Sequence, residues 1–175
     1  MKSVSLLAAF ALTAITAFAK PPSTDQVLAQ AEAKAAAEHK AIYLHFGASW
    51  CVWCRRLDAF LDRADIKPVF EKYFVPVKLV VQEDEKNKAV DNPGAAALLK
   101  KLGGPDGLPY SAFLDAQGGL IVNSKRPSPK GGENIGFPAQ PAEVDWFVQM
   151  MRKAAPKMSE GDVKTIVAAL RSPKQ

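Results

Sequence analysis

The sequence predicts an α/β fold with a mixed sheet of about four to five strands and helices on both faces. Residues 41–46 and 74–81 are β-branched and aromatic and are separated by a helical pattern, which is typical of parallel strands joined by a crossover. Residues 109–115 and 120–124 flank a glycine-bearing turn, which predicts an antiparallel hairpin. A length of 175 residues with 48% hydrophobic and 23% charged residues is typical of one globular domain.

Helices are predicted on both sides of the first strand. Residues 24–40 are rich in Ala, Glu and Lys, and Thr24 or Asp25 can cap the start of a helix. Helical spacing resumes over 51–63, with apolar residues on one face, and a short helix is predicted over 66–73. These helices connect the two predicted strands.

The second half of the chain alternates short elements with loops. A charged stretch over 82–88 predicts an exposed loop, and 92–104 predicts a short helix with proline near its start and glycine near its end. Residues 125–141 contain four prolines and three glycines and predict a loop. Two amphipathic helices are expected over 141–155 and 159–171, and the second should pack on the body of the protein or on a partner.

The amino-terminal segment has the features of a signal peptide. Residues 1–19 hold a basic Lys2, a short apolar stretch and a final Ala-Phe-Ala, so we expect cleavage before Lys20. An uncleaved anchor is the alternative. Export would place the protein in a compartment where disulfides persist.

The charges argue against a nucleic-acid-binding protein. The chain has 23 basic and 18 acidic residues, for a net charge of +5. These charges are interspersed, and they accompany no nucleic-acid-binding motif. We interpret them as a solvated surface.

The segment with the strongest chemical signal is Trp-Cys-Val-Trp-Cys at 50–54, which holds both cysteines of the chain. If Cys51 begins a helix, Cys54 lies on the same face, close enough for a disulfide. The free N–H groups and dipole of a helix N-terminus stabilise a thiolate, and Arg55 and Arg56 add positive charge. A thiolate is the species that attacks disulfides, so the pair is interpreted as redox-active.

Two other roles for the cysteines are weighed. A purely structural disulfide is disfavoured, because with two intervening residues it closes a very short loop and removes little entropy from the unfolded chain. A zinc or copper site would combine the two thiolates with His39 and His45, or would use the two thiolates alone. The geometry is poor for four ligands, since these histidines are expected on different elements from the cysteines.

These features resemble the thioredoxin superfamily. The resemblance rests on a strand, then the W-C-x-x-C motif, then a helix, with Gly-Leu-Pro at 107–109. Exported thioredoxin-like proteins and the C-terminal domain of the transmembrane disulfide reductase are similar. The resemblance implies a thioredoxin-like fold for a single domain over 20–175, with its core over about 38–155 and a helical extension over 156–175.

The resemblance also implies roles for individual residues. Cys51 would be the nucleophile, and Cys54, more buried, would resolve the mixed disulfide. Trp50 would pack beside the motif. Pro109 would be cis and its loop would present backbone groups to an extended substrate.

The sequence departs from the thioredoxin pattern at a position before the motif. His45 stands where thioredoxins carry a buried aspartate, and Lys78 matches the lysine that pairs with that aspartate. We expect the lysine to favour a neutral imidazole, which would help to deprotonate Cys54. A core histidine without a catalytic role explains His45 equally well.

A second departure lies between the cysteines, where Val52-Trp53 replaces Gly-Pro. This pair supplies no charge, so a strongly oxidising potential is not specially indicated. Trp53 is a candidate substrate contact or a packing residue, and Leu108 is a second candidate contact.

The predicted loop over 125–141 should emerge beside the cysteines, since the preceding strand returns to that end of the sheet. A loop of this length often has a function. We expect Phe137 and the basic Lys125, Arg126 and Lys130 to help select partners. A flexible surface loop is the alternative.

Together these features predict an exported, periplasmic thiol–disulfide oxidoreductase that exchanges disulfides with protein thiols and is a reductant rather than a strong oxidant. It should need no organic cofactor or resident metal, bind no nucleic acid, remain outside the membrane after signal cleavage and receive electrons from an upstream redox partner. A non-catalytic thioredoxin-like binding module and a copper or zinc carrier are the competing functions.

Overall fold

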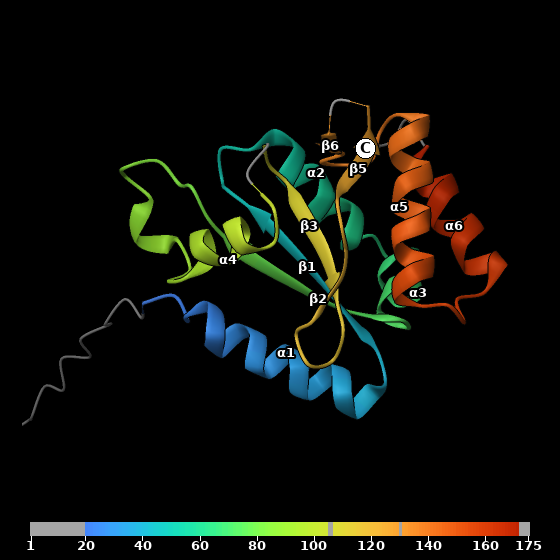
Figure 1. Cartoon of the computed structure of the whole chain (residues 1–175), viewed down its shortest axis with the longest axis horizontal. Helices are drawn as coiled ribbons and strands as arrows, with labels where there is room; N and C mark the ends of the chain where they lie inside the picture. Colours follow the sequence, from blue (N-terminus) through green and yellow to red (C-terminus); the bar gives the residue numbers. More distant parts are fainter. Residues whose placement is uncertain (1–19, 105–106, 130, 172–175) are drawn as a thin grey trace, which may run out of the picture.

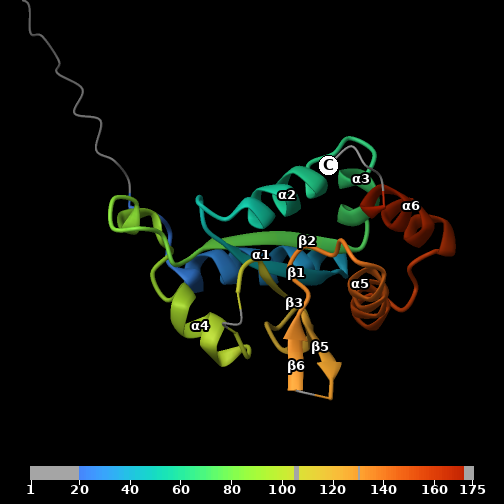
Figure 2. The ribbon, with the colours of Figure 1, turned by 90° about the horizontal axis from the view of Figure 1, so that it is seen from above.

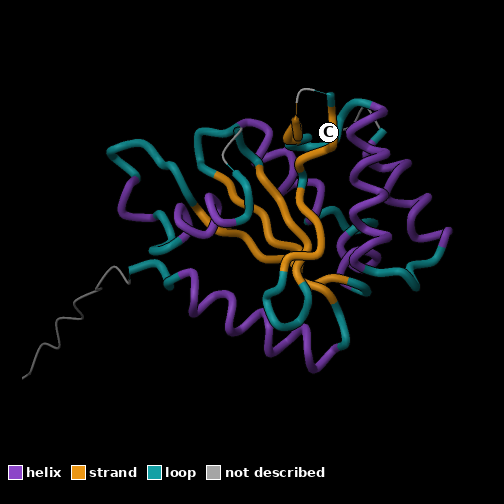
Figure 3. Tube along the Cα trace, in the orientation of Figure 1, coloured by secondary structure: helices purple, strands orange, loops and turns teal. Residues whose placement is uncertain are grey.

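The computed structural model describes residues 20–104, 107–129 and 131–171. It has a four-stranded mixed sheet in the order β2-β1-β3-β4 with helices on both faces, as the sequence predicts. Figure 1 labels the elements, and Figure 3 shows the strands at the centre of the molecule. The expected signal peptide, 1–19, lies outside the described residues.

The central strand is β1 (Ala41–Gly47), and all seven of its residues are buried. It pairs in parallel with β2 (Phe74–Val80) and antiparallel with β3 (Tyr110–Leu114), which pairs in turn with β4 (Leu120–Asn123). A strand with neighbours on both sides and helices on both faces can present apolar side chains in both directions. The sequence prediction of a fully buried strand is therefore confirmed.

Alternate residues of β1 enter two separate cores. Tyr43 packs with side chains of α2 (Val52–Leu61), α3 (Lys67–Glu71), α5 (Pro141–Ala154) and α6 (Glu160–Leu170). Leu44 faces the opposite way, toward α1 (Thr24–Glu38) and α4 (Ala95–Lys101). Figure 2 shows α2 and α4 on opposite sides of the sheet.

Two expected helix starts differ slightly from those observed. Ser23, rather than Thr24 or Asp25, caps α1, because its hydroxyl accepts the Gln26 N–H while the Gln26 side chain accepts the Ser23 N–H. Cys51 precedes the first turn of α2 as its N-cap. A short 3-10 helix, η1 (Lys88–Val90), follows the charged loop.

The prediction of a loop over the whole of 125–141 was wrong. β5 (Lys125–Ser128) and β6 (Gly131–Asn134) form an antiparallel hairpin that projects from the body, on the side opposite α2 in Figure 2. A two-stranded ribbon consists of edges only, so Pro127 can stand in it without removing a ladder hydrogen bond. Gly131 has a φ of 103°, which suits the tight turn.

The last helix, α6, packs on the body through Val163, Ile166 and Leu170. Polar contacts hold its first turn, since the Asp162 carboxylate accepts hydrogen bonds from Tyr73 Oη at 2.6 Å and Lys72 Nζ at 2.9 Å. These bonds lower the pKa of Asp162 to about 2. Among the described residues, no helix is long and apolar enough to cross a membrane.

We predict that Asp162→Asn destabilises the protein in a pH-dependent way. A carboxyl group whose pKa is lowered by folding stabilises the folded state above its unfolded pKa of about 3.9. That stabilisation is lost as the pH falls toward the folded pKa of about 2. Denaturant unfolding should therefore show a constant difference between wild type and variant above about pH 5, shrinking between about pH 4 and 2. A difference that does not change with pH would contradict the assignment.

Candidate active site

The two cysteines form a disulfide at the N-terminus of α2. Their Cα atoms are 5.2 Å apart, and Cys51 Sγ accepts the backbone N–H of Cys54 at 3.1 Å. Cys51 is 4% exposed and Cys54 is fully buried. A sulfur atom in the N-cap position receives the helix N–H groups and the positive end of the helix dipole, which stabilise negative charge on it.

Two arginines lie beside the motif. Arg55 donates a hydrogen bond to the Ser49 carbonyl at 2.6 Å, and Arg56 lies over the ring of Trp53 at 4.6 Å from its centroid. Both guanidinium groups are therefore held near the first turn of α2. Their charge adds to that of the helix N-terminus, as the sequence indicates.

The segment before Cys51 is clamped to the end of β2. Glu83 is 7% exposed, and its carboxylate accepts the Ser49 N–H at 2.5 Å and the Ser49 hydroxyl at 2.6 Å. Trp50 Nε1 donates to the Gln82 carbonyl at 2.8 Å, while the rest of its ring is largely exposed. Trp50 is thus anchored through one atom, and Glu83 is a site residue that the sequence did not reveal.

The loop before β3 closes over the disulfide. The Leu108–Pro109 peptide bond is cis. Leu108 packs against a small buried cluster formed by Ala48, Cys51 and Cys54. The Gly-Leu-Pro segment therefore packs, through Leu108, against the cluster that holds the cysteines, in the place that the resemblance implies.

Below α2, a carboxylate connects the two residues that depart from the thioredoxin pattern. His45 and Lys78 are register neighbours on β1 and β2. Asp58, from α2, accepts His45 Nε2–H at 3.0 Å through one oxygen and Lys78 Nζ at 2.6 Å through the other. Partial burial raises the pKa of Asp58, but the hydrogen bonds from His45 and Lys78 together hold this pKa below its usual range.

Asp58 changes the interpretation of His45. Lys78 meets the imidazole through this carboxylate, which compensates the lysine charge, and the expectation that Lys78 favours a neutral imidazole stays a prediction. An ionised carboxylate only accepts hydrogen bonds, so the proton of a neutral His45 lies on Nε2. The other ring nitrogen, Nδ1, is buried and has no hydrogen-bond partner among the described residues.

Cys54 lies next to this group. A Cβ atom built on Gly47 would lie 3.4 Å from Cys54 Sγ and 3.7 Å from Lys78 Cε, so both side chains flank Gly47. Cys54 and Asp58 are four residues apart on α2 and share a face. This spacing was the one signal in the sequence that could have identified Asp58.

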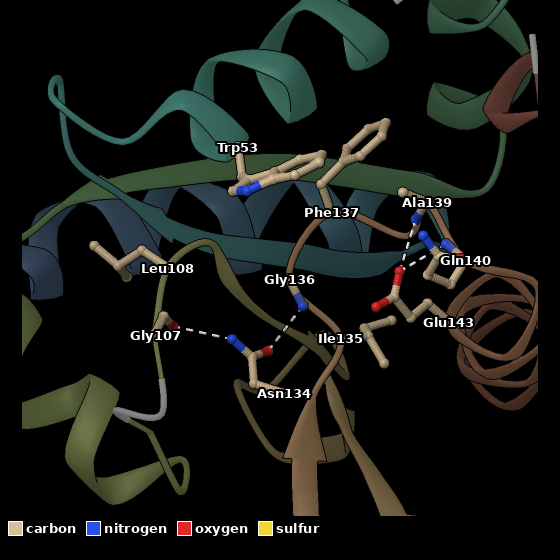
Figure 4. Close-up of a pocket in the computed structure, with 10 residues that line it drawn as sticks. All are labelled: Trp53, Gly107, Leu108, Asn134, Ile135, Gly136, Phe137, Ala139, Gln140 and Glu143. Carbon is tan, nitrogen blue, oxygen red and sulfur yellow. Dashed lines mark hydrogen bonds between the residues drawn. The ribbon is translucent and has the colours of Figure 1, made fainter. Parts of the chain in front are cut away.

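The three candidate substrate contacts line one groove of about 300 Å³ (Figure 4). Trp53 stacks on Phe137 with ring centroids 6.2 Å apart, and Leu108 lies on the opposite wall. Phe137 is 4% exposed, whereas Trp53 is 46% exposed. The groove therefore begins at the cysteine motif and runs toward the start of α5.

Two of the basic residues expected to select partners, Lys125 and Arg126, do not line this groove. Arg126 pairs with Glu133 across the hairpin at 2.9 Å and lines a different cavity, beside Trp146. Lys125 lies beside Gly132 on the facing strand of the hairpin. Lys130 lies outside the described residues.

The four-ligand metal set is not assembled. His39 ends α1 before β1 begins, whereas the cysteines follow the other end of β1, and His45 is bonded to Asp58. In residues 20–104, 107–129 and 131–171, no group of three or more His, Cys, Asp or Glu side chains is placed to hold a metal ion.

The family follows from a comparison of the sequence with known families. Residues 24–116 match the family model described as Thioredoxin-like. The chain belongs to the thioredoxin-like family. The matched region of this thioredoxin-like protein contains both cysteines, His45 and Pro109, whereas Phe137 and the β5–β6 hairpin lie beyond it.

Solved structures provide further likenesses. A disulphide isomerase from Xylella fastidiosa Temecula1 is 22% identical with a TM-score of 0.49, over 89% of this chain and 100% of that one. The oxidised C-terminal domain of DsbD from Neisseria meningitidis is 21% identical with a TM-score of 0.46, over 75% and 99%. A thioredoxin from Thermus thermophilus is 19% identical with a TM-score of 0.41, over 59% and 72%. No curated protein sequence matches significantly.

We predict that Glu83→Ala destabilises the oxidised protein by about 2 kcal/mol, because it removes the buried carboxylate that accepts two hydrogen bonds from Ser49. Denaturant unfolding of the disulfide form measures this loss. Glu85→Ala is the matched control, since Glu85 is an exposed carboxylate on the same loop. Equal stability of the two variants would show that the clamp contributes nothing.

Proposed function

We propose that this protein is a thiol–disulfide oxidoreductase that acts on protein thiols and disulfides. The observation that carries the proposal is the disulfide between an N-cap cysteine and a buried cysteine, covered by the Leu108–Pro109 loop. The N-cap position favours the thiolate form of Cys51 once the disulfide is reduced. Membership of the thioredoxin-like family supports the same chemistry.

The reaction proceeds through a mixed disulfide. The thiolate of Cys51 attacks one sulfur of the partner's disulfide, and the other partner sulfur leaves as a thiolate. Cys54 then loses its proton and attacks Cys51 Sγ, which releases the second partner sulfur. The partner gains two electrons, and the dithiol of this protein is oxidised to the disulfide. The reverse sequence oxidises a partner dithiol.

His45 is the proposed acceptor for the proton of Cys54. Asp58 keeps the imidazole proton on Nε2, so the lone pair of Nδ1 is free in the buried space below α2. Cys54 faces the same region beside Gly47. In this proposal Asp58 and Lys78 orient and balance the histidine and do not themselves take the proton.

We further propose that the protein is an exported reductant whose mature chain, 20–175, is one domain. The signal-like segment 1–19 supports export, with the periplasm as the destination. Val52 and Trp53 place no charge between the cysteines. They therefore give no special stabilisation to the reduced form, which a strongly oxidising potential would require. A reductant must be reduced again after each cycle, which requires an upstream redox partner.

The first experiment is the redox equilibrium of the mature protein in glutathione buffers, with thiols trapped and counted. A potential at or below about −230 mV is expected for a reductant, whereas about −120 mV would indicate an oxidant of folding proteins. Cys54→Ser should accumulate a mixed disulfide between Cys51 and a protein substrate. A pair that fails to exchange within a day would reject the oxidoreductase and favour a binding module.

We predict that His45→Gln slows resolution of the mixed disulfide at pH 7 about a hundredfold, because the amide can still donate to Asp58 but cannot take a proton. The deficit should shrink as the pH rises, since hydroxide replaces the missing base. Stopped-flow fluorescence of Trp50 and Trp53 follows the step. His39→Gln, at the far end of β1, is the control, and wild-type rates across pH in His45→Gln would reject the role.

A further inference from the structure

Asn134, the last residue of β6, uses all of its side-chain hydrogen-bonding groups. Its Nδ2 atom donates to the Gly107 carbonyl at 2.9 Å and to the Pro109 carbonyl at 3.0 Å. Its Oδ1 atom accepts the Ser124 hydroxyl at 2.7 Å and the Gly136 N–H at 3.3 Å. The bonds to Gly107 and Gly136 are drawn in Figure 4.

These four bonds allow one orientation of the amide. A flipped Asn134 would place its oxygen against two carbonyl oxygens and its NH2 group against the N–H of Gly136. The two donors and two acceptor positions of the side chain are satisfied at once. Asn134 is therefore fixed relative to both the hairpin and the loop before β3.

The sheet core supports Asn134 through a second side chain. Ser124 is fully buried, and its Oγ accepts the Ser111 N–H at 3.0 Å while donating to Asn134. The Ser124 N–H donates to the Ser111 carbonyl at 2.8 Å. A chain of hydrogen bonds thus runs from the buried Ser111 and Ser124 through the half-buried Asn134 to the loop at Pro109, and such fully satisfied chains are rigid.

Asn134 bonds the loop on both sides of Leu108, through the carbonyls of Gly107 and Pro109. In the described residues the N–H and C=O of Leu108 itself have no hydrogen-bond partner. The Leu108 side chain packs against the cluster that holds the cysteines.

We propose that Asn134 is a positioning residue for polypeptide substrates. Its amide bonds to the carbonyls of Gly107 and Pro109 and so holds Leu108, between them, beside Cys51. The partner it serves is an extended protein segment whose backbone pairs with Leu108 while its disulfide meets Cys51. Small disulfides, which need only the sulfur of Cys51, gain nothing from Asn134. This inference rests on the proposed oxidoreductase function.

The test compares two substrates with one set of variants. Reduction of insulin disulfides measures the polypeptide reaction, and reduction of oxidised glutathione measures the small-molecule reaction. Asn134→Ala should lower kcat/KM for insulin about tenfold or more, mainly through KM, and change the glutathione rate less than about twofold. Asn123→Ala is the matched control, because Asn123 makes a similar amide-to-carbonyl bond at 3.0 Å, but to Leu102 at the C-cap of α4 rather than to Gly107 or Pro109.

Asn134→Asp tests the donor and acceptor halves of the amide separately. The carboxylate can still accept from Ser124 and Gly136, but it repels the carbonyls of Gly107 and Pro109. It should therefore match Asn134→Ala in its loss of insulin reduction. Near-wild-type activity of Asn134→Asp, or an equal loss on both substrates in Asn134→Ala, would overturn the inference and assign Asn134 a structural role.

The wild type separates this inference from the function on which it rests. If wild-type protein reacts with neither disulfide, the proposed function fails and the role of Asn134 fails with it. If wild-type protein reduces both disulfides and Asn134→Ala has the same substrate preference, only the role of Asn134 fails. Circular dichroism and the rate of Cys51 alkylation establish that each variant is folded before its kinetics are compared.

Discussion

The parallel pairing of β1 with β2 is the constraint on which the rest of the site depends. Because the two strands run the same way, their carboxyl ends lie at one edge of the sheet. The pairing continues past the strands, with a backbone bond between Val81 and Gly47, and then with side-chain bonds that join Gln82 and Glu83 to the segment before Cys51. The position of the cysteine motif is thus fixed by the sheet and by a buried carboxylate together.

The same pairing explains the charge arrangement below α2. It places His45 and Lys78 side by side, which would leave a cation beside a buried imidazole without compensation. Asp58 enters from α2 and contacts both. A thioredoxin-like site that carries its acid on the strand needs no such carboxylate on the helix. In this protein the acid lies on the helix, and the strand position holds a histidine that donates a hydrogen bond to it.

The local features of the site could be predicted from the sequence, and its long-range contacts could not. The buried strand 41–46, the helix after Cys51 and the position of Pro109 each follow from short patterns of residue type. Glu83 reads as one more charged residue in an exposed loop, although it is buried against Ser49, 34 residues earlier. Its role depends on a pairing that the pattern of residue types does not specify.

The hairpin was missed for a related reason. High proline and glycine content is typical of loops but also occurs in a two-stranded ribbon, where no central position forbids proline. What stabilises the ribbon is its contact with the rest of the protein, through Asn134 and the Ser124 carbonyl, which accepts the Ile135 N–H at 3.0 Å. Such contacts become visible only when the strands have been placed in space.

The chain divides its functions between two regions of sequence. Every group proposed to transfer electrons or protons lies within 24–116, the part that matches the thioredoxin-like family. Phe137 and Asn134, which line the groove beside the cysteines, lie outside it. Changes in the hairpin can therefore alter the groove and the loop at Pro109 without touching the thiols or His45. Because one wall of the groove comes from residues outside the matched region, we propose that selection of partners and the chemistry of exchange are separable.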